Sequence, residues 1–165
     1  MSIKLLGIEV LESLIAAAKQ SPRGRQHLNL HENHSDKAQR LLNAIGTESY
    51  IRPHRHFLDP KPELLVAISG VLSLLVFNDA GEIEEITRLG PEPNKSSCFA
   101  VELSPADWHT VIAHTPDAVI LEIKPGPFDP FTAKEYAPWA PEENSLEAMV
   151  YFSRLRDRVK LGFLD

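Results

Sequence analysis

A chain of 165 residues is long enough to form one domain with a buried core, without support from disulfides or a second subunit. Its hydrophobic fraction of 43% and charged fraction of 24% are typical of a water-soluble globular protein. The formal net charge of −6 argues against a nucleic-acid partner, and no segment is long and apolar enough to predict a membrane span. The first residues carry no signal-peptide pattern, so we expect a cytoplasmic protein.

The first 45 residues predict helices on either side of a strand. Apolar residues recur at helical spacing in Ile8–Gln20, which predicts an amphipathic helix. Polar and apolar residues alternate in His27–His31, a pattern typical of a half-buried strand. Lys37–Ile45 is interpreted as a second short helix, because its apolar residues fall on one helical face and Gly46 follows its end.

From Tyr50 onward the pattern changes to short strands joined by turns, which favours a sandwich or barrel over an alternating α/β fold. The expected strands are Tyr50–His56, Glu63–Ser69, Val71–Phe77, Glu82–Arg88, Cys98–Leu103, Trp108–His114 and Ala118–Lys124.

Two further segments follow the predicted strands. Pro125–Pro141 is rich in proline and aromatic residues, so we expect an ordered strap across the barrel. Ser145–Lys160 is predicted to be a helix whose apolar residues cover more than one face. That width indicates packing on the barrel and on a second subunit, and we therefore expect a homodimer.

The motif His54-Arg55-His56 predicts half of a metal site, because side chains two residues apart on a strand point the same way. The motif alone is a weak signal. Glu63, at the start of the next apolar run, and His109, after Trp108, supply the ligand types that would complete the site. Three imidazoles and one carboxylate suit one divalent transition metal, Fe, Mn, Ni or Zn, with coordination positions left open.

The spacing of Gly46, His54, His56, Glu63 and Gly70, followed by a second-motif histidine at His109, resembles the cupin superfamily. This resemblance implies a mainly β, double-stranded β-helix (jelly-roll) barrel and the ligand set His54, His56, Glu63 and His109. We then expect a single cupin domain over residues 1–165, with an N-terminal extension at 1–45, the barrel core at 46–124, and the strap and C-terminal helix at 125–165.

Longer segments resemble the WbuC family of cupin-fold metalloproteins, which tends to be found with bacterial surface-polysaccharide genes. The similar segments are His27–His31, Asp36–Asn43, Tyr50–His56, Trp108–Val111, Glu122–Phe128 and Ala137–Pro141. The resemblance implies the fold and metal binding, and it brings no established reaction.

Four residues outside the ligand set are candidates for contact with a small-molecule substrate: Tyr50, Arg52, Lys124 and His31. Tyr50 and Arg52 share the strand face of His54, and Arg52 suits an anion. The alternative, a Tyr50 hydroxyl tied to backbone and an Arg52 paired with an acidic neighbour, stays open. Lys124 and Glu122 share a face that is either a solvent-exposed rim, which we favour, or the cavity wall, and His31 could lie near the mouth of the barrel.

The leading hypothesis is an enzyme acting on a small polar or anionic molecule, such as a sugar or nucleotide-sugar. An isomerase or epimerase would use Glu63 or Tyr50 to move a proton. A metal-dependent dioxygenase and a non-catalytic sugar-binding or regulatory cupin are the alternatives.

Overall fold

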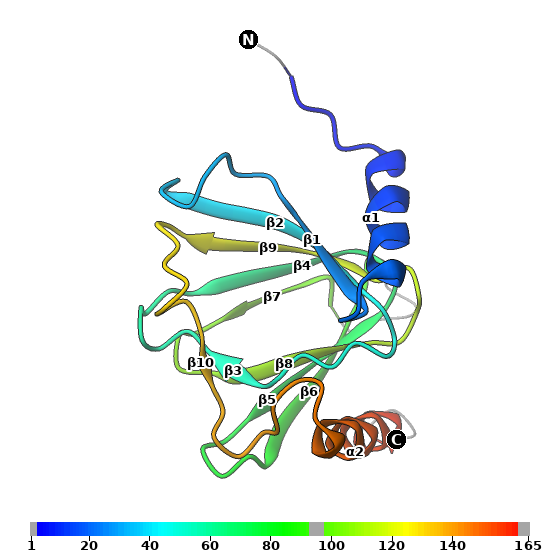
Figure 1. Ribbon diagram of the computed structural model, residues 1–165, viewed down its shortest axis with the longest axis vertical. Helices are drawn as coiled ribbons and strands as arrows, with labels where there is room; N and C mark the ends of the chain where they lie inside the picture. The colour runs from blue at the N-terminus through cyan, green and yellow to red at the C-terminus, as the bar shows by residue number, and fades with distance from the viewer. Residues whose placement is uncertain (1–2, 93–97, 162–165) are drawn as a thin grey trace.

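The computed structural model describes residues 3–92 and 98–161, and this part of the chain forms two five-stranded antiparallel sheets with a helix near each end (Figure 1). Its elements are α1 (Ile8–Gln20), β1 (Arg25–Asn29), β2 (Ala38–Ile45), β3 (His54–Arg55), β4 (Glu63–Ser69), β5 (Leu72–Phe77), β6 (Ile83–Leu89), β7 (Ala100–Leu103), β8 (Trp108–Ala113), β9 (Val119–Pro125), β10 (Glu135–Tyr136) and α2 (Leu146–Leu161). The mainly β fold class with helices at the two ends is therefore confirmed. Neither of these helices is long and apolar enough to cross a bilayer.

The two sheets face each other and enclose the main core. The first has the strand order β1-β2-β9-β4-β7 and the second β10-β3-β8-β5-β6. Helix α1 lies on the outer face of the first sheet, against β1 and β2 (Figure 1). Helix α2 covers the outer face of the second sheet, where Phe152, Leu155 and Val159 pack beside Leu75 and Ile112.

Strand alternation decides which side chains reach the space between the sheets. On β8, Trp108 and Ile112 pack outward with α2, whereas Val111 joins the inner core. On β9, Val119 packs under α1 and Ile120 joins the inner core. The positions that continue the inner alternation toward the other end of the sheets carry polar side chains, and that end contains the functional site.

The helix predicted over Lys37–Ile45 is wrong, because this segment is β2. It pairs antiparallel with β1 on one side and β9 on the other. Its last four residues are all buried, because α1 covers one face of this sheet and the core between the sheets covers the other. The apolar spacing fits a helical face by chance, and tertiary pairing overrides it.

The predicted strand Tyr50–His56 is also shorter than expected. Only His54–Arg55 forms the ladder, with His54 paired opposite His109 on β8. The other predicted strands occur within two or three residues of their expected ends.

The segment 125–141 is an ordered strap across one end of the barrel. Within it, β10 pairs antiparallel with β3. Its Glu135 forms two hydrogen bonds with Arg55, at 2.8 and 3.0 Å. Near its start, the Gly126 amide donates to the carbonyl of Lys37, at 2.8 Å. The strap is therefore attached to both sheets.

Candidate metal centre

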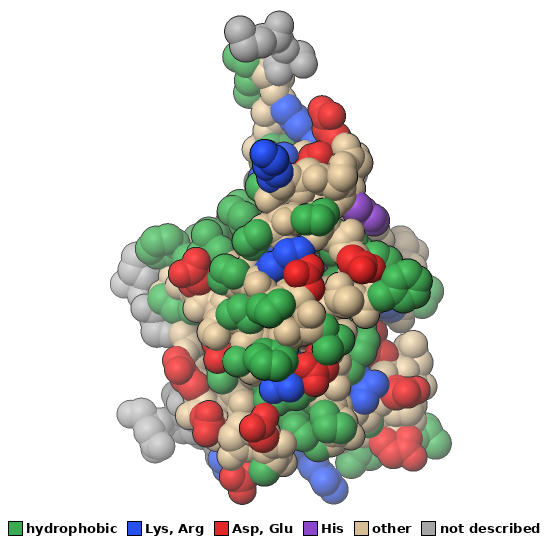
Figure 2. Space-filling model, turned by 90° about the vertical axis from the view of Figure 1, so that its left-hand side faces the viewer, with side chains coloured by type: hydrophobic (Ala, Val, Ile, Leu, Met, Phe, Trp, Pro, Cys, Tyr) green, Lys and Arg blue, Asp and Glu red, His purple; other side chains and the backbone are tan. Residues whose placement is uncertain are grey.

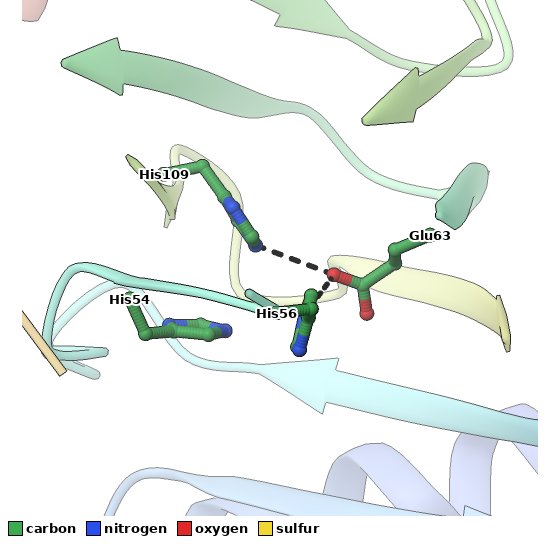
Figure 3. Close-up of side chains that lie close together, drawn as sticks. All are labelled: His54, His56, Glu63 and His109. Carbon is green, nitrogen blue, oxygen red and sulfur yellow. Dashed lines mark hydrogen bonds and ion pairs between the residues drawn. The ribbon is translucent and has the colours of Figure 1, made fainter. Parts of the chain in front are cut away.

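His54, His56, Glu63 and His109 come together in the space between the sheets (Figure 3). One ligand atom from each lies within 4.8 Å of those of the others, and all four side chains are buried. The two motif histidines come from β3 and the residue after it, Glu63 is the first residue of β4, and His109 is the second residue of β8. The pairing of His54 with His109 brings their ring centroids to 4.6 Å.

Each of the three imidazoles is oriented by a backbone carbonyl that bonds its Nδ1 atom. The carbonyls belong to Arg52 for His54, Ala133 for His56 and Asp107 for His109, at 3.0, 2.6 and 2.8 Å. A carbonyl can only accept a hydrogen bond, so Nδ1 carries the proton in each ring. The neutral tautomer then leaves Nε2 with a free lone pair, as a metal ligand requires.

The Glu63 carboxylate is divided between the histidines and a lysine. Its Oε2 lies 2.9 Å from the Nε2 of His56 and 3.3 Å from that of His109. Its Oε1 accepts from the Nζ of Lys124 at 2.7 Å. Burial alone would raise the pKa of Glu63, but the charge of Lys124, together with the adjacent His109 and His56 rings, outweighs burial and holds this pKa well below its usual range. The carboxylate is therefore ionised, as a ligand must be.

Burial is also the main cause that lowers the pKa of His54 well below its usual range, and the nearby Lys134 charge acts in the same direction. The His54 imidazole is therefore neutral at physiological pH. Three unprotonated imidazole nitrogens and one carboxylate oxygen are a donor set that Fe, Mn, Ni and Zn all accept. The residues fit a divalent metal, and the donor set does not select one of these metals.

A cavity of about 280 Å³ lies beside the cluster, and His54, Glu63 and His109 form part of its wall. The remaining wall includes polar side chains from the inner face of the first sheet and from the strap: Arg25, His27, Asn43, Glu122 and Lys134. The three histidines of the cluster are buried, and Figure 2 shows histidine at one place on the face turned toward the viewer. The centre is thus enclosed but adjoins space for a small molecule.

Comparison with known proteins places this architecture in a family. The sequence of residues 6–89, just over half of the chain, matches a family described as "Domain of unknown function (DUF6016)". The chain belongs to this family. No curated protein matches the DUF6016 chain in sequence.

Solved structures share the fold of the DUF6016 chain at low sequence identity. An uncharacterized conserved protein with a double-stranded β-helix domain from Klebsiella pneumoniae is 11% identical, with a TM-score of 0.57, over 82% of this chain and 98% of that one. A cupin 2 domain-containing protein from Halorhodospira halophila is 13% identical, with a TM-score of 0.50, over 81% of each chain. An oxalate oxidase in complex with the substrate analogue glycolate is 10% identical, with a TM-score of 0.53, over 87% and 72%. The predicted cupin double-stranded β-helix is therefore confirmed, and the buried histidine and glutamate cluster fits a metal-binding cupin.

Two of the residues predicted to meet substrate lie away from the cavity in the DUF6016 chain. The Tyr50 hydroxyl donates to the carbonyl of Pro141 at 3.0 Å, and its ring packs on α2 against Phe152. Arg52 donates to the carbonyl of Ala137 at 3.1 Å and lies over the Tyr136 ring. The expectation that both side chains share the direction of His54 is corrected, because β3 begins only at His54 and strand alternation does not extend before it.

Lys124 and His31 also differ from the expectations. Lys124 does not lie on a solvent-exposed rim. It points inward and bonds Glu63, so its charge holds a candidate ligand in place. His31 Nδ1 instead lies 2.8 Å from the carbonyl of Arg40 and 3.0 Å from its amide nitrogen, and its side chain does not line the cavity.

Sequence reasoning missed several polar residues of the cavity wall, among them Asn43 and Lys134. Asn43 was hidden by the interpretation of its segment as a helix. Lys134 lies in the strap, which has no periodicity from which a side-chain direction could be read. Glu122, which shares its strand face with Lys124, also lines the cavity, so the cavity-wall alternative holds for that face.

The lowered histidine pKa values predict how stability depends on pH in the metal-free protein. Burial is the largest cause that lowers the pKa of His27, His54 and His114 below the ordinary value of 6.5. Below that pH the unfolded chain binds more protons than the folded one, so stability is present above about pH 6.5 and is lost as pH falls. Calorimetry between about pH 8 and about pH 5 should show a falling Tm, and a Tm that rises on acidification would contradict the assignment.

Proposed function

We propose that this protein is a cupin enzyme that binds one divalent transition metal through His54, His56, Glu63 and His109 and acts on a small polar or anionic molecule. One observation carries the proposal. Three imidazoles, each fixed by a carbonyl on Nδ1, converge with an ionised carboxylate at the wall of a cavity. A purely structural metal site would be closed on all sides and would need no adjoining cavity.

A bound divalent metal would supply Lewis acidity, which polarises a carbonyl or activates water. The chain itself supplies the rest of the chemistry. The strap excludes bulk water from the centre, and its Ala133 carbonyl fixes the ring of His56. Lys124 holds Oε1 of Glu63 and so turns Oε2 toward the histidines. Since Tyr50 lies elsewhere, Glu63 is the one proposed proton carrier that lies at the site.

The cavity favours a small substrate. A volume of about 280 Å³ is at the lower end of the range for small-molecule sites, so a sugar or sugar acid fits the proposal better than an entire nucleotide-sugar. The link to surface-polysaccharide metabolism rests on the sequence resemblance to the WbuC family. With that resemblance, isomerisation or epimerisation is the proposed reaction class.

Proton exchange with solvent tests the proposed reaction. Protein reconstituted separately with Fe, Mn, Ni or Zn is incubated in deuterated water with a panel of aldoses, ketoses and sugar acids, and the products are followed by NMR. We expect deuterium at a carbon next to a carbonyl with at least one metal and one sugar, and no incorporation with His109→Ala. Absence of incorporation and of conversion with every metal and sugar would contradict isomerase or epimerase activity.

A dioxygenase is the second candidate, because the same donor set suits iron and one fold neighbour is an oxalate oxidase. Anaerobic loading with Fe(II), followed by addition of air-saturated buffer and small carboxylates, distinguishes it. Substrate-dependent oxygen uptake would favour oxygenation. The non-catalytic alternative instead predicts sugar binding that survives replacement of both His54 and His109 by alanine, with no turnover.

We further propose a cytoplasmic homodimer that associates through α2. Leu146, Met149 and Val150 on this helix are 79%, 70% and 55% exposed, although all three are apolar. Replacing Met149 with glutamate should convert the dimer to a monomer in analytical ultracentrifugation, because it puts a charge into an apolar contact. Replacing the exposed Lys19 on α1 with glutamate is the control and should leave the mass unchanged. A native protein that sediments as a monomer would contradict the dimer.

A further inference from the structure

Nearly every charged group around the cavity has a partner of opposite charge or a hydrogen bond. Arg25 forms a bidentate ion pair with Glu143, in which one guanidinium nitrogen lies 2.7 and 2.6 Å from the two carboxylate oxygens. Lys124 is paired with Glu63 at 2.7 Å. Glu122 accepts a hydrogen bond from Asn43 at 2.8 Å. The two ion pairs are each neutral, and the Glu122 carboxylate also lies 3.9 Å from the Nζ of Lys124. Each of these charges therefore has a partner within the protein.

Lys134 is an exception, and it is less exposed than Arg23, the other cation of the cavity wall for which the described residues show no side-chain partner. It lines the same cavity, and within residues 3–92 and 98–161 its ammonium group has no hydrogen bond and no ion pair. Its backbone is fixed on both sides, because the Ala133 carbonyl bonds His56 and Glu135 pairs with Arg55 between β10 and β3. An ordered backbone therefore presents an unpaired cation to the cavity, next to the candidate metal centre.

The surroundings of Lys134 are unfavourable to its own charge. Burial is the main cause that lowers its pKa below the usual lysine value, and repulsion from Lys124 adds to the effect. A cation kept in such a place without a partner costs folding free energy. A ligand anion would offset that cost, as Glu63 does for Lys124.

Asn43, on β2, adds a second unfilled position to the cavity wall. Its amide nitrogen donates to Glu122, which fixes the assignment of oxygen and nitrogen, since a carboxylate only accepts. Its Oδ1 is buried and has no hydrogen-bond partner among the described residues, although the whole residue is only 3% exposed. A buried acceptor of this kind requires a donor, and a ligand hydroxyl can be that donor.

We propose that Lys134 binds the anionic group and Asn43 accepts a hydroxyl of a small hydroxy acid held beside the metal centre. This inference rests on the proposed function for the presence of a substrate site and adds the substrate class. The strap then selects the substrate as well as covering the site. Lys134 is a binding residue in this account. The ligand's charge is recognised from the strap, and its hydroxyl is recognised from β2.

Three matched three-carbon probes test the proposal: D-glycerate, glycerol, which lacks the charge, and propionate, which lacks the hydroxyls. Each is titrated calorimetrically into native protein, Lys134→Met, Lys134→Arg and the exposed-lysine control Lys37→Met, in metal-free and metal-loaded forms. We expect native protein to bind D-glycerate tighter than either other probe. Lys134→Met should weaken D-glycerate binding about tenfold or more and leave glycerol unchanged. Lys134→Arg should stay within about threefold of native, and the control should match native.

Stability and metal content separate a binding role from a structural one. Because Lys134 is unpaired, Lys134→Met should have a Tm equal to or above that of the native protein, and the same metal content. D-glycerate binding that is equal in native and Lys134→Met protein, or native protein that does not prefer D-glycerate over glycerol, would overturn the inference. Native protein that binds none of the metals would instead contradict the proposed function. The metal-free titrations would still decide the role of Lys134.

Discussion

Replacing Glu63 with glutamine is expected to destabilise the metal-free protein by about 3 kcal/mol, at the lower end of the range for breaking a buried ion pair. The change leaves Lys124, whose side chain is 18% exposed, without its close carboxylate partner. Glu122 remains at 3.9 Å from the lysine and limits the loss. Chemical denaturation at neutral pH in the presence of a chelator measures the change.

The double variant Glu63→Gln, Lys124→Met is the matched control. It removes both buried charges, so it should recover most of the stability that the single change loses. A single variant as stable as the native protein would show that the Glu63–Lys124 pair does not contribute. A double variant no more stable than the single one would show that the loss has another origin.

Replacing His56 with alanine is expected to lower the affinity for divalent metal by more than about 100-fold, which is more than the loss of a group behind a ligand causes. The change removes one of the three oriented Nε2 atoms and one of the two rings that contact Glu63 Oε2. Competition titration against a chromophoric chelator gives the affinity for each metal.

His27→Ala is the control for this measurement. His27 lines the same cavity but does not belong to the four-residue cluster, so its replacement should leave affinity within about threefold of native. Equal losses in both variants would indicate a metal bound by the cavity wall in general and would contradict the proposed ligand set.

The histidine motif could be placed from sequence because it depends on one local rule. Residues two apart on a strand point the same way, and β3 is a strand at His54, the residue that pairs opposite His109. Glu63 could be placed because it begins an apolar run that becomes β4 with the bounds expected. Its alternate residues Glu63, Leu65 and Ala67 are the buried ones, as strand geometry requires.

The rest of the site depends on pairing between distant segments, which local patterns do not contain. The local pattern of β2 predicts a helix, and the strand forms because β1 and β9 pair with it. Asn43 faces the cavity only in that paired strand. The side-chain direction expected for Arg52 is wrong because the strand starts two residues after it. Lys134 lies in a strap whose path is set by contacts with both sheets, among them the bond from the Ala133 carbonyl to His56.

Elemental analysis of the native protein, purified without chelators and then reconstituted with Fe, Mn, Ni or Zn, tests the central claim most directly. The account predicts close to one divalent metal per chain, and its loss in the variant that replaces both His54 and His109 with alanine. A native protein that retains none of these metals, or a double variant that retains as much as the native protein, would contradict it.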